Sequence, residues 1–99
     1  MKNKEIFQKA LDRWGDVAQI DMAIEECSEL IFSIQKLKRN YSNNKDKNKQ
    51  LIENVCDEIA DVEIMMKELE LIFDKEYIKE RKKYKMNRLE KRLKKSNDD

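Results

Sequence analysis

The sequence of 99 residues has almost none of the residues that turn or break a chain, with no proline and a single glycine, Gly15. β-rich folds need turn formers and β-branched runs, and both are scarce here. Histidine is absent, and without it the two cysteines, Cys27 and Cys56, are too few ligands for a zinc site. The composition therefore predicts an all-α protein and argues against zinc chemistry.

Long apolar runs and an excess of charge of one sign are also missing. No stretch approaches the roughly 20 apolar residues that span a bilayer, and residues 1–15 lack the apolar core of a secretory signal. The 22 lysines and arginines nearly balance the 21 aspartates and glutamates. The bulk charge thus indicates neither nucleic acid nor membrane as a partner. We expect a cytoplasmic protein whose cysteines are small, reduced and buried.

Apolar residues recur with helical period in four segments, at about 3–13, 16–39, 50–73 and from 74 onward. Gly15 should end the first helix, and Asp16 is a candidate N-cap of the second. We expect a flexible loop at the polar residues 40–49 and a frayed tail at 94–99.

These segments predict a single domain spanning residues 1–99, a small four-helix bundle. Its centre would be two long antiparallel helices, with shorter helices at the N- and C-terminal ends. A chain this short buries only about 60–65% of its surface. We therefore expect an oligomer.

Two acidic pairs interrupt the amphipathic pattern of the long helices. At 100° per residue, the apolar arc of the second helix holds Ile20, Ala23, Ile24, Cys27, Leu30, Ile31 and Ile34. Glu26 lies at the edge of that arc, and Glu29 lies one step further round. The apolar face of the third helix holds Leu51, Val55, Ile59, Val62, Met65, Met66, Leu69 and Phe73. Glu58 projects inside this stripe, and Asp61 lies on its margin.

Acids at a spacing of three residues are neighbours on a helix, so two facing pairs would bring four carboxylates into one small volume. Mutual repulsion and desolvation would raise their pKa values. Protons, lysine or arginine partners, or a divalent cation could relieve the cluster, and the neighbouring core positions supply no lysine or arginine. Oxygen ligands alone suit Mg²⁺ or Mn²⁺. The alternative is that the acids lie on an exposed or oligomer-facing surface.

The two motifs resemble those of a known family. EECSE at 25–29, followed after 28 residues by EIAD at 58–61, is similar to the EExxE and ExxD pair of the MazG-like all-α nucleoside triphosphate pyrophosphohydrolases. The flanking segments WGDVAQIDMAIEECSELIFSIQKLKR, ENVCDEIADVEIMMKEL and KMNRLEKRL agree, so the resemblance covers about residues 7–93. The polar loop puts the motif spacing near the upper end of the family's range.

The resemblance implies a cation-dependent hydrolase that cuts a nucleoside triphosphate between its α and β phosphates, as a homodimer or homotetramer. The implied Mg²⁺ ligands are Glu26, Glu29, Glu58 and Asp61. Glu25 would be an auxiliary ligand or would orient the attacking water. Because the chain has no histidine, the general base must be a carboxylate or a hydroxide on the metal, and Glu25 or Glu29 is the candidate.

A second charged region lies near the C-terminus. Residues 75–95 hold 11 lysines and arginines against 3 glutamates, whereas residues 53–70 hold 7 acids against one lysine. By similarity to the family's K-x-x-R element, Lys85 and Arg88 would grip the phosphates; the alternative is a solvated basic helix. Gln19 could hydrogen-bond a nucleobase. Lys36 could reach phosphates, or it could simply complement the negative end of its helix.

Two other functions fit the same residues. A narrow dUTP or dCTP pyrophosphatase would use the same chemistry with a tighter base pocket. A non-enzymatic helical module would serve as a coiled-coil adaptor or bind RNA with its basic helix, with a steep salt dependence. An adaptor needs a sustained apolar seam, and Glu58 interrupts that seam at its centre.

Overall fold

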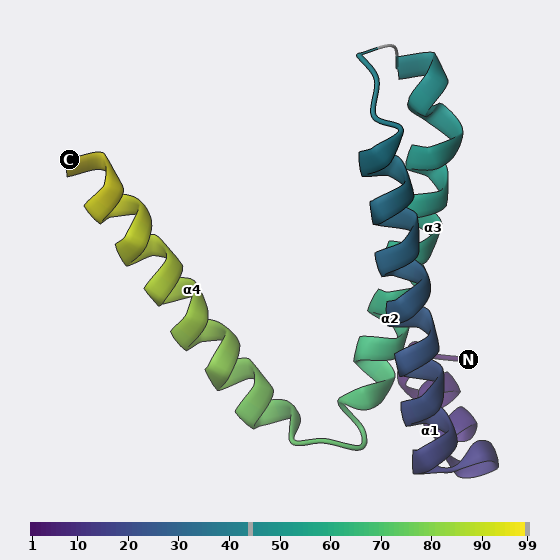
Figure 1. The fold of residues 1–99 in the computed structure, drawn as a ribbon. Coiled ribbons are helices and arrows are strands. Elements are labelled where there is room, and N and C mark those ends of the chain that lie inside the picture. Colours follow the sequence, from purple (N-terminus) through teal and green to yellow (C-terminus); the bar gives the residue numbers. More distant parts are fainter. Residues whose placement is uncertain (44, 99) are drawn as a thin grey trace.

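The computed structural model describes residues 1–43 and 45–98, with all of their side chains except those of residues 45, 47 and 96–98. This part of the chain forms four helices and no strand: α1 (Asn3–Trp14), α2 (Asp16–Arg39), α3 (Lys45–Leu69) and α4 (Lys75–Asp98). Figure 1 shows α2 and α3 side by side, α1 against their lower end, and α4 diverging from them to form a V. The predicted all-α class with four helices is confirmed.

The α2–α3 pair carries the core, and each helix contributes one row of buried and half-buried residues at heptad spacing. On α2 these residues are Gln19, Ala23, Glu26, Leu30, Ser33 and Leu37. On α3 they are Leu51, Val55, Glu58, Val62, Met65 and Leu69. Both rows alternate steps of four and three residues, which keeps one seam of each helix against its partner over the whole length. We call these two rows the packed seam.

The turn between α1 and α2 depends on Gly15. Its φ of 87° and ψ of 164° lie in a region that is essentially open only to glycine. Gly15 also occupies the N-cap position of α2, and no side chain caps this helix. The prediction of Asp16 as N-cap is therefore wrong. Asp16 is instead the first helical residue, where its charge complements the positive end of the helix.

The boundaries of the other helices differ from the predicted ones. α3 begins at Lys45, so the loop prediction for 45–49 is wrong, and position 44 lies outside the described residues. Asn48 explains the early start, because its side chain is buried and bonds the backbone N–H and C=O of Ser42. α3 ends at Leu69 rather than 73. α4 stays helical to Asp98 and is as long as α2, with 24 residues each, while residue 99 lies outside the described part.

α1 and α4 are placed very differently. α1 contacts both α2 and α3, whereas α4 packs against none of the other helices in the described chain. The connection at 70–74 begins a splayed arm rather than a return into the bundle (Figure 1). None of the described helices combines the length and apolar character that a membrane span requires.

Candidate functional site

The two central acids of the sequence motifs face each other in the middle of the packed seam. Glu26 stands between Ala23 and Leu30 on α2, and Glu58 stands in the equivalent row on α3. Both side chains are half-buried. The heptad spacing forces this position, because a residue at a seam step points at the partner helix whatever its polarity. The predicted inward orientation of Glu58 is thus found in the fold.

Asp61 joins these two residues from the next turn of α3. One carboxylate oxygen from each of Glu26, Glu58 and Asp61 lies within 4.8 Å of the others. The Oε2 atoms of Glu26 and Glu58 are buried, and neither has a hydrogen-bond partner among the described residues. Buried polar atoms in folded proteins are nearly always partnered. The arrangement therefore lacks a positively charged or proton-donating group at this point.

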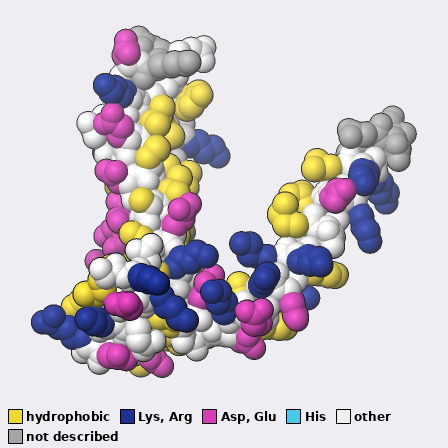
Figure 2. Space-filling model, turned by 180° about the vertical axis from the view of Figure 1, so that it is seen from behind, with side chains coloured by type: hydrophobic (Ala, Val, Ile, Leu, Met, Phe, Trp, Pro, Cys, Tyr) yellow, Lys and Arg dark blue, Asp and Glu magenta, His cyan; other side chains and the backbone are white. Residues whose placement is uncertain are grey.

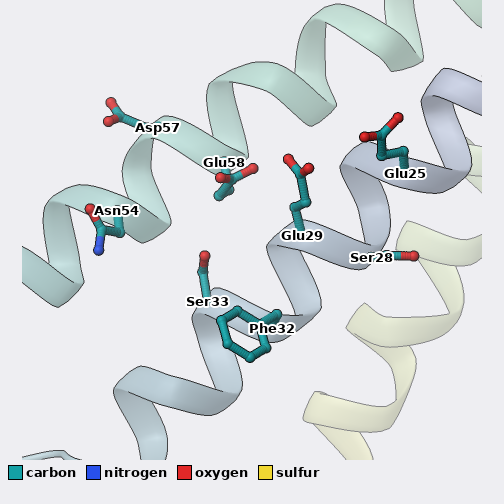
Figure 3. Close-up of a pocket in the computed structure, with 8 residues that line it drawn as sticks. All are labelled: Glu25, Ser28, Glu29, Phe32, Ser33, Asn54, Asp57 and Glu58. Atoms are coloured by element: carbon teal, nitrogen blue, oxygen red, sulfur yellow. The ribbon is translucent and has the colours of Figure 1, made fainter.

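A depression of about 460 Å³ opens beside the cluster, between α2 and α3. Figure 3 shows the carboxylates of Glu29 and Glu58 directed toward each other across the gap, with Glu25 one turn along α2. The remaining lining residues are Ser28, Phe32, Ser33, Asn54 and Asp57. Glu29 thus borders the cluster from the solvent side, and Glu25 lies at the rim of the same depression.

The electrostatics of the cluster agree with its geometry. Burial raises the pKa of Glu58 above its ordinary value of 4.5, and the charges of Glu29, Asp61 and Asp57 raise it further. Burial likewise raises the pKa of Glu26, followed by the charges of Glu29, Asp61 and Glu58. No lysine or arginine lines the depression, and the ion pairs of the described chain lie elsewhere. The salt-bridge explanation is therefore not realised within the described residues.

The residues fit a hard divalent cation. All donors are carboxylate oxygens, the ligand type that Mg²⁺, Mn²⁺ and Ca²⁺ prefer. Two oxygens that share one Mg²⁺ lie at most about 4.2 Å apart, and two that share one Ca²⁺ at most about 5 Å. Because the three oxygens all lie within 4.8 Å of one another, a small rotation of a side chain would let them share one ion. A cation would also supply the partner that the two buried oxygens lack.

The structure gives Gln19 a buried partner that the sequence did not reveal. Gln19 is 5% exposed and Glu68 on α3 is 4% exposed. With the amide nitrogen turned toward the acid, Nε2 of Gln19 donates to both carboxylate oxygens of Glu68 at 2.7 Å. Burial raises the pKa of Glu68. The only signal in the sequence for the inward position of Glu68 was its spacing of three residues from Met65. The side chain of Gln19 is thus held between the helices by Glu68, and its binding to a nucleobase stays a prediction.

The predicted cationic residues do not reach the cluster in this chain. Lys36 is exposed in the last turn of α2. Lys85 and Arg88 are exposed on α4, which contacts none of the other helices. Their binding to phosphates stays a prediction.

Comparisons of this chain with protein-family models, with curated proteins and with solved structures find no match.

Proposed function

We propose that this protein is a divalent-cation-dependent nucleoside triphosphate pyrophosphohydrolase, which converts a (d)NTP into the monophosphate and pyrophosphate. The main support is the pair of half-buried acids, Glu26 and Glu58, whose carboxylates lie within 4.8 Å of each other and each keep one buried oxygen without a hydrogen-bond partner among the described residues. The reaction itself is suggested by the resemblance of the EExxE and ExxD segments to the MazG-like enzymes. Cys27 is half-buried and Cys56 is exposed, so the predicted burial is wrong for Cys56. Both thiols are free, which fits a reducing cytoplasm.

In this proposal four acids of α2 and α3 bind the cation. Glu26, Glu58 and Asp61 hold Mg²⁺ or Mn²⁺ in the middle of the α2–α3 pair, and Glu29 closes the set from the solvent side. When bound, the ion neutralises phosphate charge and lowers the pKa of a coordinated water. Packing between α2 and α3 keeps the acids in place, because the residues before and after Glu26 and Glu58 in the packed seam lie against the facing helix. Positioning and charge neutralisation are the main requirements of phosphoryl chemistry.

Proton transfer falls to the acids at the rim. Glu25 and Glu29 are exposed, line the depression beside the cluster and stand within one turn of each other on α2. A carboxylate there accepts the proton of the attacking water while the anhydride bond between the α and β phosphates breaks and pyrophosphate leaves. Ser33 on α2 and Asn54 on α3 add a hydroxyl and an amide to the lining of the same depression, whereas the Ser28 hydroxyl donates to the Ile24 carbonyl.

Pyrophosphate release from a panel of NTPs and dNTPs tests this function. We expect turnover that requires Mg²⁺ or Mn²⁺, is abolished by Glu58→Gln and Glu29→Gln, and is unchanged in the control Glu53→Gln, whose exposed side chain lies outside the depression. Circular dichroism should show intact helices in all three variants. Full turnover in both site variants would show that the assigned site is wrong.

The same panel separates the other two functions. Turnover confined to dUTP or dCTP would identify a narrow pyrophosphatase with the same site. A wild-type protein that hydrolyses no nucleotide and binds no divalent cation would overturn the proposal and favour the helical interaction module. The exposed basic helix α4 is the observation on which that module would rest.

A further inference from the structure

The charged and aromatic residues of α4 are sorted by type around the helix. At 100° per residue, six of the residues 75–95 fall within one arc of about 80°, and they include all three arginines and both tyrosines of α4. The other basic residues of the helix are all lysines, so arginine and tyrosine share one face. We call this row the basic–aromatic stripe. It consists of Tyr77, Arg81, Tyr84, Arg88, Arg92 and Lys95.

The glutamates of α4 lie on a different face. Glu76, Glu80 and Glu90 fall within a second arc of about 80°, which does not overlap the stripe. Glu90 pairs with Lys94 at 2.9 Å, and neither ion pair of the described chain includes a residue of the stripe. The cations of the stripe are therefore available to an anion from outside the chain.

Like charges are neighbours along the stripe. Arg88 and Arg92 are four residues apart, and Arg92 and Lys95 are three apart. Such pairs repel each other and destabilise a helix, whereas glutamate and lysine at these spacings would support it. A helix that only has to stay solvated gains nothing from this arrangement. Cations gathered on one face are instead typical of a surface that binds a polyanion.

The tyrosines give the stripe a second kind of contact. Tyr77 is 58% exposed and Tyr84 is 54% exposed, although tyrosine rings carry a large apolar area. The guanidinium of Arg81 lies over the ring of Tyr84, 4.7 Å from its centroid. Proteins stack unpaired bases on aromatic rings and on guanidinium planes, and arginine also binds phosphate through two parallel N–H groups. The stripe offers both contacts over a length of about 27 Å.

The stripe stays in water whatever covers the apolar side of α4. The apolar row of this helix consists of Ile78, Met86, Leu89 and Leu93. Tyr77 and Tyr84 lie about 140–160° from the middle of that row. α4 packs against none of the other described helices, and Figure 2 shows its hydrophobic side chains toward the interior of the V. A surface that packs on the apolar row therefore leaves the tyrosines exposed.

A membrane and a duplex fit these residues less well than a single strand does. A helix at a bilayer surface turns its apolar row toward the lipid, and aromatic residues anchor it beside that row. In α4, Lys82 falls in the middle of the apolar row and both tyrosines lie on the far side. The bases of a duplex are already stacked on one another and offer the tyrosines no free ring face.

We propose that the basic–aromatic stripe of α4 binds single-stranded nucleic acid, with Tyr77 and Tyr84 stacked on bases and the arginines bound to phosphates. The contact needs no particular sequence, because every base has a ring face on which an aromatic side chain can stack. The whole chain has a formal net charge of only +1, so the attraction comes from this face. The binding does not depend on the proposed hydrolase activity.

The salt dependence of binding is the first test. Fluorescence anisotropy follows a labelled single-stranded oligonucleotide of about 12 nucleotides, with EDTA present so that no metal-dependent turnover occurs. With the four stripe cations on phosphates, the logarithm of the association constant should fall against the logarithm of the salt concentration with a slope of about −2.8. Arg81→Gln combined with Arg92→Gln should bring the slope to about −1.4.

A matched control separates the stripe from the charge of the helix as a whole. Lys79→Gln combined with Lys83→Gln removes the same charge from exposed residues of α4 on the side away from the stripe. This variant should keep the slope of the wild type. Lys85 and Arg88 stay intact in every variant, so nucleotide turnover is scored separately from oligonucleotide binding.

Replacing the tyrosines tests the stacking. Tyr77→Ala combined with Tyr84→Ala should weaken binding at least about fivefold per ring at every salt concentration, with an unchanged slope. Tyr41→Ala is the control, because Tyr41 is 69% exposed and lies outside α4. All these side chains are exposed, so the helical circular dichroism should persist.

Several outcomes overturn the proposal. These are a wild type that binds no oligonucleotide, a duplex of the same sequence bound as tightly as the single strand, and an equal loss of affinity in the stripe and control variants. Vesicles that contain phosphatidylserine are the second probe. A protein that binds these vesicles but not the oligonucleotide would use α4 as a membrane-surface helix, which also overturns the proposal.

Discussion

Replacing Glu58 with glutamine should have opposite effects on stability with and without a divalent cation. In the metal-free protein, Glu58 lies beside Glu26 and Asp61, and its burial together with the charges of Glu29, Asp61 and Asp57 raises its pKa. A neutral amide of the same shape removes this repulsion. We therefore expect metal-free Glu58→Gln to melt at a higher temperature than the metal-free wild type.

Adding Mg²⁺ or Mn²⁺ should invert this order. A ligand at a hundredfold excess over its Kd stabilises the folded state by about 2.7 kcal/mol. For a chain of this size each kcal/mol moves the midpoint by roughly 4–8 °C, so the wild type should gain roughly 10–20 °C. Glu58→Gln has one fewer anionic ligand beside the carboxylate oxygens of Glu26 and Asp61. The cation should therefore raise its melting temperature far less.

Thermal melts followed by circular dichroism measure both effects, at one fixed protein concentration and with EDTA in the metal-free arm. Glu53→Gln is the matched control, because it removes an acid from the same helix outside the depression. It should respond to the cation as the wild type does. Equal stabilisation of the wild type and Glu58→Gln by Mg²⁺ would refute the shared-ion interpretation. A lower melting temperature of metal-free Glu58→Gln would refute the repulsion on which it rests.

Two further predictions concern the rest of the fold. Burial raises the pKa of Glu68 above 4.5, so the folded state keeps a proton that the unfolded chain releases; the free energy of unfolding should fall as the pH rises from 4.5 through the raised value. The difference between the wild type and Glu68→Gln in urea unfolding isolates this slope, and parallel pH profiles would contradict it. Gly15→Ala should destabilise the fold by about 1–3 kcal/mol through backbone strain alone, since nothing lies within 4 Å of an added Cβ. An unchanged melting temperature would argue against the φ of 87° at this turn.

Helix periodicity is a local property, and it accounts for most of what the sequence predicted correctly. The four helices and the inward position of Glu58 follow from spacing along each helix. The early start of α3 was missed because the polar residues 45–49 carry no apolar period. The buried side chain of Asn48 accepts a hydrogen bond from the backbone N–H of Ser42 and so holds the turn before α3. This contact can be seen only in the folded chain.

The apolar arcs predicted for α2 and α3 were each too simple. In the fold, Ala23 and Leu30 belong to the packed seam, while Ile24 and Ile31 are exposed beside it. A helical wheel gives the angle of a residue about its own axis but not the number of helices around it. The width of the α2 arc was therefore visible in the sequence, whereas its division into a packed part and an exposed part was not.

By itself, the sequence determined that the chain is helical and that each long helix turns carboxylates toward its apolar side. The tertiary structure alone decided which oxygens meet, because the antiparallel register of α2 and α3 brings Glu26 opposite Glu58 and Asp61. It also decided that Gln19 is engaged by Glu68 and that α4 stands apart from the helices it was expected to join. Contacts between residues far apart in the chain depend on how whole helices are laid against one another, and no local pattern encodes that placement.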